Sequence, residues 1–340
     1  MEQLLLTRAS TLAAFTDLLY DIGAPVDSEL ERCNLPVNLN HQTNLFVPVS
    51  RALDFVTAAD RKEDIDDIVF RALSCSRSGW NGQNVLPAAI GPPTLFAGLC
   101  EFLDLVRFEN PNMHFSIVRK QNELRIEGQF DPDLDDDELH IVEWTIILQL
   151  LSLIRRSLGA DFCPEEIQFQ RPFTPCRNAR EDLPNARFIF GHPKTSILMP
   201  TDVLGQSVRR ARWNRRLDDA QHETAHSPIP PVLDFSSSLR LAMRAYLSDG
   251  YPSINTAAEI AGVSARTLQR RLAEDDQTYS ELILQARFEV ASELLGQSEL
   301  KIIDVAYAAG YEDPSHFSRA FRRIAGVTPL QYRRDIRAQA

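Results

Sequence analysis

The sequence has few cysteines and no long apolar run, and each absence excludes a class of protein. Its 340 residues include five cysteines, an odd number scattered without paired spacing. This distribution does not predict a disulfide framework, and it favours free thiols in a reducing cytoplasm. No stretch reaches the roughly 20 apolar residues of a membrane-spanning helix. Residues 1–14 also lack an apolar run of signal-peptide length, so we expect a cytoplasmic protein without membrane contact.

An excess of positive charge is missing too. The chain carries 36 Lys and Arg residues against 47 Asp and Glu residues, a net charge of −11. Residues 236–340 contain 13 of each kind, so the net negative charge belongs entirely to residues 1–235. A neutral domain attracts phosphate only if its arginines are clustered on one face. Any affinity for DNA should therefore be modest and steeply dependent on salt.

The most informative pattern lies at about residues 302–325. A short apolar stripe predicts a helix, and Gly310 follows it where the chain must turn. Asp313, with a proline directly after it, fits the N-cap and first turn of a second helix. Phe317 and Phe321 are four residues apart and should face a core. This succession is typical of a helix-turn-helix unit, whose second helix lies in the major groove of DNA.

A second unit of the same kind precedes it, at about residues 254–276. Small apolar residues predict its first helix, Gly262 the turn, and Ser264 the N-cap of its second helix. Between the two units, Tyr279–Leu295 reads as one long amphipathic helix. Such a helix would hold two DNA-reading helices at a fixed separation, which should be roughly 34 Å if both face one side of a duplex.

Residues 239–335 resemble the DNA-binding domain of the AraC/XylS family of bacterial transcription regulators. The resemblance covers both units, the connecting helix and the closing Gly-Val-Thr-Pro pattern that begins at Gly326. One departure is Asp276, which stands where many relatives have glycine after the first reading helix. Because Asp adopts the left-handed conformation less easily than Gly, we expect that helix to end differently.

The DNA contacts are expected on the outward faces of the two second helices. An arginine suits the acceptor edge of guanine and a glutamine suits adenine. The alternative for each residue is a phosphate contact or a solvated side chain, since most hydrogen bonds to DNA go to its backbone. From this reasoning and the resemblance, the candidates are Arg266, Thr267, Gln269 and Arg270 in the first unit, and Ser315, His316, Ser318, Arg319 and Arg322 in the second.

The N-terminal two-thirds of the chain predicts an α+β domain. Glu138–Leu158 is apolar nearly all round, which indicates a helix buried in a core or at a subunit interface. The remaining signals are amphipathic helices at 12–20 and 48–59 and strands at 114–118, 124–129, 167–169, 188–190 and 196–199. Residues of about 10–210 resemble the arabinose-binding-type effector domain found in one branch of the same family. The resemblance implies a domain that senses a small molecule and can mediate dimerisation.

The residues that would touch an effector are not readable from the pattern. Weak candidates, each of which a structural role would also explain, are Arg77, Trp80, Arg119, Arg125 and Trp144. The predicted organisation is an effector-binding and dimerisation domain at 1–216, a proline-containing linker at 217–235, and an all-α domain at 236–340 in which a long helix joins two helix-turn-helix units.

Two enzymatic interpretations are weak. His222-Glu223-Thr224-Ala225-His226 matches the H-E-x-x-H pattern of zinc proteases, but it lies in the polar linker, where Pro228 ends any helix. Alkyl-accepting DNA-repair proteins carry a similar helix-turn-helix domain beside a cysteine cluster that this chain lacks. We therefore expect no catalytic residue, metal or cofactor.

The sequence predicts a transcription regulator, more often an activator in this family, that is controlled by a small-molecule effector. Its expected partners are double-stranded promoter DNA, RNA polymerase, a second copy of the chain and the effector. An effector-independent regulator and a nucleoid-type protein remain alternatives.

Overall fold

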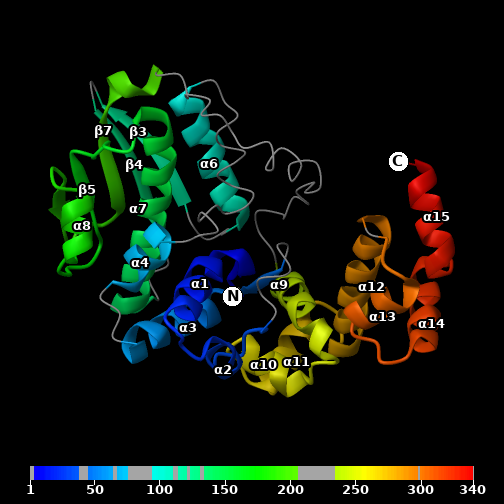
Figure 1. The fold of residues 1–340 in the computed structure, drawn as a ribbon. Coiled ribbons are helices and arrows are strands. Elements are labelled where there is room, and N and C mark those ends of the chain that lie inside the picture. Colours follow the sequence, from blue (N-terminus) through cyan, green and yellow to red (C-terminus); the bar gives the residue numbers. More distant parts are fainter. Residues whose placement is uncertain are drawn as a thin grey trace. The chain divides into compact units, whose positions relative to one another are not determined.

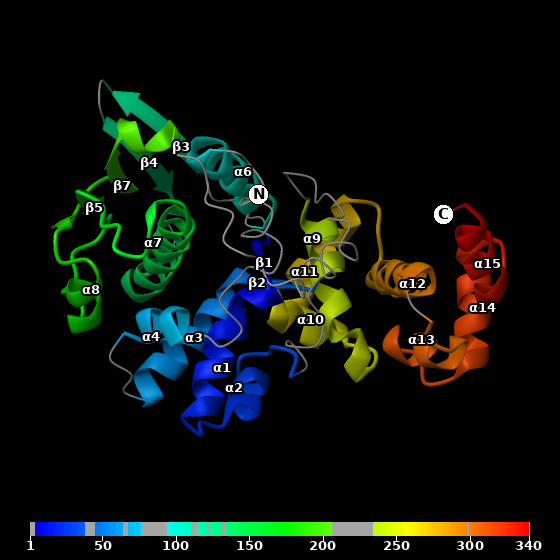
Figure 2. The same cartoon turned by 45° about the horizontal axis from the view of Figure 1, so that its top comes forward.

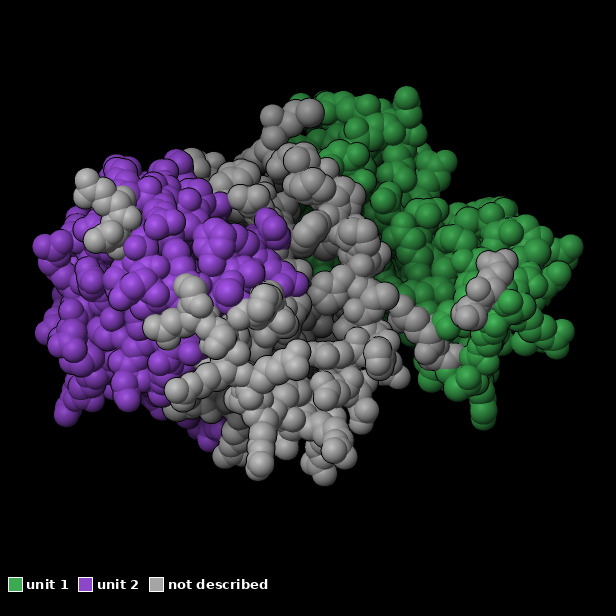
Figure 3. All heavy atoms as spheres, turned by 90° about the horizontal axis from the view of Figure 1, so that it is seen from above, with its two compact units in different colours: residues 1–9, 30–51, 233–340 green, residues 10–29, 52–232 purple. Residues whose placement is uncertain are grey.

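The computed structural model describes residues 4–37, 45–63, 67–75, 94–109, 114–120, 123–130, 134–205, 234–297 and 299–339. The chain forms two compact units (Figure 3). We call residues 10–29 and 52–232 the N-terminal unit, and residues 1–9, 30–51 and 233–340 the C-terminal unit. The C-terminal unit thus includes two early stretches of the chain that the sequence analysis assigned to the N-terminal domain.

The N-terminal unit contains a five-stranded sheet in the order β3-β4-β7-β5-β6 (Figure 1). Its strands are β3 (His114–Lys120), β4 (Glu123–Gln129), β5 (Glu166–Gln168), β6 (Arg187–Ile189) and β7 (Thr195–Pro200). All neighbours are antiparallel except β5 and β6. Burial alternates along β4, where Leu124 and Ile126 face the core. The five predicted strands and the α+β class of this region are confirmed.

Helices pack around this sheet and on one another. The helical elements that lie wholly or mostly in this unit are η1 (Ala9–Leu12), α1 (Ala13–Asp21), α2 (Val26–Arg32), α3 (Val49–Glu63), α4 (Ile68–Cys75), α6 (Leu95–Glu109), α7 (Asp136–Leu158), α8 (Arg177–Asp182) and η3 (Thr201–Gly205). α7 contacts α4, α6 and β7, and α6 contacts β3. The two helices predicted at 12–20 and 48–59 correspond to η1 with α1 and to α3.

α7 is the central helix of this core. Asp135 begins it with a capping box. Its carboxylate accepts the Glu138 N–H at 2.8 Å, and the Glu138 carboxylate accepts the Asp135 N–H at 3.0 Å. Trp144 is fully buried, with the rings of Phe70 and Phe169 each 5.0 Å away. Because these side chains are buried within a single chain, the core interpretation of this helix is confirmed.

One charged side chain of α7 is buried with them. Glu143 is fully inaccessible, and its Oε1 accepts the hydroxyl of Thr195 and the N–H of Gln170, the latter at 2.7 Å. Its Oε2 has no partner among the described residues. Burial penalises the ionised form and raises the pKa of Glu143 to about 7. This carboxyl group is therefore neutral in the folded chain at mildly acidic pH.

The C-terminal unit is helical apart from a small antiparallel pair, β1 (Leu6–Arg8) with β2 (Phe46–Pro48). Its helical elements are α9 (Phe235–Met243), η5 (Arg244–Asp249), α10 (Ile254–Ile260), α11 (Ala265–Glu274), α12 (Tyr279–Gln297), α13 (Ile302–Ala308), α14 (Pro314–Ala325) and α15 (Pro329–Gln339). The two predicted helix pairs, α10–α11 and α13–α14, and the long helix between them are present.

α12 organises this unit. It packs against α9 on one side and against α13, α14 and α15 on the other, as Figures 1 and 2 show. Towards its C-terminal end, Ala291 and Leu295 join a core with Phe317 and Phe321. Near its middle, Arg287 lies over the rings of Tyr251 and Tyr311, at 5.0 and 4.5 Å from their centroids, and donates to the Gly310 carbonyl.

The turn of the second helix pair and the end of α11 both take a left-handed backbone conformation. Gly310 has φ of 77°, and a Cβ there would lie 2.6 Å from the Leu247 carbonyl oxygen, so only glycine fits. Asp276, after α11, has φ of 52°. Asp276 thus takes the left-handed conformation that glycine supplies in many relatives, and the expectation that this helix end differs because Asp avoids it is wrong. Asp is one of the few residues with a side chain that tolerate it.

Replacement of Glu143 by Gln should change how stability depends on pH. The pKa of Glu143 is about 7 in the folded chain, above its ordinary value of 4.5, so the folded chain binds the extra proton between these values. Its contribution is fully present below the ordinary pKa and is lost as the pH rises through about 7. Glu143→Gln cannot ionise, so wild type should lose stability relative to this variant between about pH 5 and pH 8.

Urea unfolding at both pH values measures this difference. Glu181→Gln is the control, because Glu181 is exposed and pairs with Arg177 on the same helix. Equal changes with pH in wild type and Glu143→Gln would show that Glu143 does not titrate in this way.

Candidate nucleic-acid interface

α11 presents polar side chains on one face because its other face is anchored. The Ser264 hydroxyl caps the helix by accepting the Thr267 N–H at 3.1 Å. Leu268 and Leu272, four residues apart, are buried at 0% and 1% exposure. With that face fixed, the remaining predicted residues of this helix, Arg266, Gln269 and Arg270, are exposed.

α14 is built in the same way. The Asp313 carboxylate accepts the Ser315 N–H at 2.8 Å, and Pro314 occupies the first turn. This hydrogen bond lowers the pKa of Asp313, so its carboxylate stays ionised at the positive end of the helix. Phe317 and Phe321 are buried. The side chains left exposed on this helix include four of the predicted residues, Ser315, His316, Arg319 and Arg322.

The other two predicted residues form bonds within their own helices. The Thr267 hydroxyl lies 2.8 Å from the hydroxyl of Ser264, so it belongs to the N-cap of α11. The Ser318 hydroxyl donates to the Pro314 carbonyl at 3.0 Å. Both side chains are half-buried. The Ser318 hydroxyl therefore has only acceptor capacity left, and the Thr267 hydroxyl is already engaged within its own helix.

Arginine is concentrated on these two helices. Arg266, Arg270 and Arg271 lie on α11, and Arg319, Arg322 and Arg323 on α14, six of the 13 basic residues in 236–340. The only acid within either helix is Glu274, which is 3.7 Å from Arg270. The two helices together therefore carry a local excess of positive charge within a domain that is neutral overall. Sequence reasoning did not single out Arg323, which is exposed beside Arg322.

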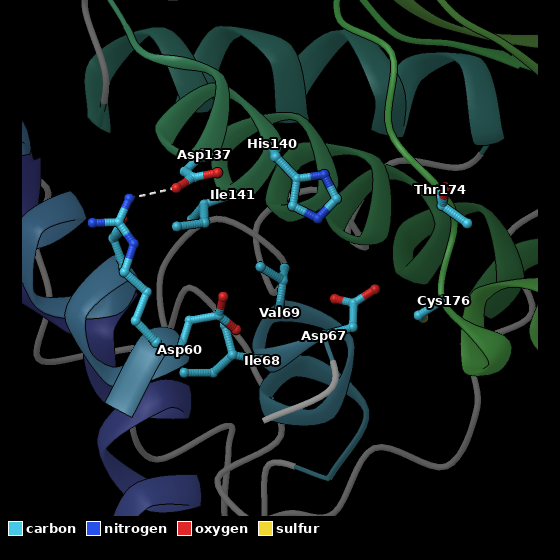
Figure 4. Close-up of a pocket in the computed structure, with 11 residues that line it drawn as sticks. Asp60, Asp67, Ile68, Val69, Asp137, His140, Ile141, Thr174 and Cys176 are labelled. Atoms are coloured by element: carbon cyan, nitrogen blue, oxygen red, sulfur yellow. Dashed lines mark hydrogen bonds and ion pairs between the residues drawn. The ribbon is translucent and has the colours of Figure 1, made fainter. Parts of the chain in front are cut away.

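The N-terminal unit contains a cavity of about 620 Å³. Figure 4 shows how its walls come from α3, the start of α4, α7 and the segment before α8. The lining residues are Thr57, Asp60, Arg61, Asp67, Ile68, Val69, Asp137, His140, Ile141, Thr174 and Cys176. These residues are far apart in the sequence, and no local motif marks them.

Carboxylates dominate the electrostatics of this cavity. Burial raises the pKa of Asp60, and the charges of Asp67 and Asp137 raise it further. Arg61 pairs with Asp137 at the exposed rim. Burial lowers the pKa of His140, and its Nδ1 is buried with no partner among the described residues. The cavity therefore offers hydrogen-bond acceptors and net negative charge to a small molecule.

The three weak effector candidates that the structure describes lie outside this cavity. Arg77 and Trp80 lie outside the described residues. Arg119 is exposed on β3, and Arg125 donates to Ser196 at 2.9 Å and to Glu166 at 3.1 Å across the sheet. Trp144 is part of the core. None of these last three lines the cavity.

The H-E-x-x-H segment at 222–226 also lies outside the described residues. Within the described part of the chain, no group of three or more His, Cys, Asp or Glu side chains is arranged to hold a metal ion. Over the same residues, no helix combines the length and apolar character needed to cross a bilayer.

The C-terminal helices are similar to a known domain family. Residues 257–335 match the profile of a family described as a helix-turn-helix domain. The regulator VirS of Mycobacterium tuberculosis is 25% identical over 96% of both chains. The transcriptional activator NphR of a Rhodococcus species is 36% identical over 26% of this chain and 27% of its own.

The chain is also similar to solved structures. The transcriptional regulator CdpR of Pseudomonas aeruginosa has 19% identity and a TM-score of 0.40, covering 91% of this chain and 96% of its own. The DNA-binding domain of AdpA, solved with a target DNA, has 27% identity and a TM-score of 0.27, covering 31% of this chain and 94% of its own.

Proposed function

We propose that this chain is a sequence-specific, effector-controlled regulator of transcription of the AraC type, which reads DNA with two helices. The match of residues 257–335 to a helix-turn-helix domain and the similarity to VirS and NphR, which are named as a transcriptional regulator and a transcriptional activator, support this proposal. The observation that carries this proposal is the repeated construction of α11 and α14. Each helix has a side-chain cap at its start and two buried apolar side chains four residues apart. Each exposes arginines on the opposite face.

The tandem arrangement gives one chain two DNA contacts. α11 and α14 belong to one unit in which α12 lies between α9 and α13. In this proposal each reading helix enters a major groove, and the two grooves are successive ones on the same side of the duplex. Arg266, Gln269 and Arg270 read one block of bases, and Ser315, His316, Arg319 and Arg322 contact the other.

Control by a small molecule is proposed for the N-terminal unit. The cavity beside α3 and α7 has a volume in the range of ligand-binding pockets, which is roughly 300–1,000 Å³. Its acceptors at Asp60 and Asp67 favour a ligand with amine or hydroxyl donors. The ligand would act by binding one state of the unit more tightly than another. Homodimerisation, contact with RNA polymerase and activation of transcription complete the proposal, and NphR carries the name of an activator.

Selection of genomic DNA fragments by the purified full-length chain tests the proposed function. We expect a recurring site with two conserved blocks whose centres are about one helical turn apart. Binding to that site should weaken steeply between two salt concentrations, because arginines displace counterions from phosphates. No enrichment over random DNA, both alone and in cell extract, would contradict sequence-specific regulation.

Arg270→Ala and Arg319→Ala should each weaken binding to the selected site by about 1–3 kcal/mol, because each removes a bidentate contact with a base. Binding to random DNA should change much less. Arg337→Ala is the matched control, since Arg337 lies on α15 and pairs with Glu299. An equal loss on selected and random DNA would make these arginines phosphate contacts instead.

The cavity can be tested by filling it. A metabolite that binds the native chain should raise its melting temperature, and Thr174→Trp should abolish that rise because an indole occupies the cavity. Ser116→Trp, at an exposed position on β3, should retain the rise. A ligand whose effect survives Thr174→Trp binds elsewhere.

A further inference from the structure

A side chain from early in the sequence forms hydrogen bonds with the first helix pair. Arg51 lies at the start of α3, yet its Nη2 donates to the Glu259 carbonyl at 2.8 Å and its Nε donates to the Ile260 carbonyl at 3.3 Å. These carbonyls belong to the last turn of α10. The bonds span more than 200 residues of sequence. Arg51 is thus part of the DNA-binding unit although it lies far outside the matched helix-turn-helix domain at 257–335.

The position of Arg51 suits the end of a helix. The last carbonyls of α10 cannot all find partners within the helix, and they carry the negative end of its dipole. A guanidinium group supplies both positive charge and donors in a fixed plane. Its Nη2 also lies 3.8 Å from where a Cβ on Gly262 would stand, in the turn between α10 and α11. Arg51 therefore contacts the end of one helix and approaches the turn that sets the direction of the next.

A second contact fixes the same stretch of chain. The Tyr246 hydroxyl, in η5, donates to the Asn34 carbonyl at 2.8 Å. Burial raises the pKa of Tyr246, so it remains a donor at neutral pH. Between these two anchors, β2 packs on α9 and η5, and Val47 is fully buried. Asn34, β2 and Arg51 thus each contact the helices of the C-terminal unit.

From these contacts we infer that Arg51 is a positioning residue for DNA reading. It fixes the end of α10 and the following turn, and so sets the angle at which α11 enters the groove. The pair α13–α14 has its own support from α12 and does not depend on Arg51. This inference deepens the proposed function and rests on it only for the effect on DNA.

The test uses the full-length chain with Arg51→Ala, Arg51→Lys and Tyr246→Phe, and Lys62→Ala as control. Lys62 is a basic residue on the same helix that pairs with Glu29. Hydrogen exchange without DNA is measured first. Arg51→Ala should speed exchange of the amides at 261–263 and leave those of α13 and α14 unchanged. Arg51→Lys, which keeps the charge but not the planar fork, should give a smaller change.

Binding to the selected site is measured next. Arg51→Ala should weaken this binding by about tenfold, as expected for the loss of hydrogen bonds to a charged group. The DNA block read by α11 should lose its protection, and the other block should keep it. Tyr246→Phe should also speed amide exchange and weaken DNA binding, by a smaller factor than Arg51→Ala. If Arg51→Ala does not fold, Tyr246→Phe provides the test. Lys62→Ala should match wild type.

The outcomes separate the two proposals. The positioning role would be overturned if the amides at 261–263 exchanged in Arg51→Ala as fast as in wild type. It would also be overturned if Arg51→Ala lost protection of both DNA blocks to an equal degree. Absence of specific binding by the wild-type chain would count against the proposed function, and the exchange measurement would then decide on Arg51 alone.

Discussion

The contact on which the C-terminal unit depends is made by Arg287, near the middle of α12. Its guanidinium stacks between Tyr251, just before the first helix pair, and Tyr311, in the turn of the second, and it also donates to the Gly310 carbonyl. A guanidinium group can stack on rings with its faces while its N–H groups donate in the plane, a combination that the compact ammonium group of lysine does not offer. Through this one side chain, α12 holds both helix pairs in a fixed frame.

The neighbours of Arg287 show how closely this frame is packed. The Tyr279 hydroxyl donates to the Pro252 carbonyl at 2.7 Å, which ties the start of α12 to the segment before α10. Arg240, on α9, pairs with Glu289 of α12 at 3.0 Å. The turn at Gly310 allows no side chain, because the Leu247 carbonyl lies against it. In the proposed function, a rigid connection between α11 and α14 would let a domain without net positive charge gain from two modest contacts with the same duplex, since the second contact would need little further ordering.

The sequence predicts well those features that depend on residues close together in the chain, such as helix caps, turns and strands. The cap at Asp313 and the turn at Gly310 located the second helix pair, and alternating or continuous apolar patterns located five strands and α7, because these signals act over a few residues. The prediction failed at Asp276, where the chain takes the left-handed conformation without glycine.

Long-range contacts could not be predicted. Nothing near Arg51 indicates a bond to α10, and nothing near Asp60 or His140 indicates that they line one cavity. These arrangements follow from how distant segments pack, which local patterns do not encode.

In the proposed function, one chain places α11 and α14, at a separation fixed by α12, on successive major-groove segments of one duplex. Hydroxyl-radical footprinting of the selected site with wild type and Arg287→Ala tests it most directly. For wild type we expect two protected stretches on one face of the duplex, about 10 base pairs apart. For Arg287→Ala we expect weaker protection with a less regular distance between the two stretches. A single protected stretch with wild type, or a footprint that Arg287→Ala leaves unchanged, would contradict it.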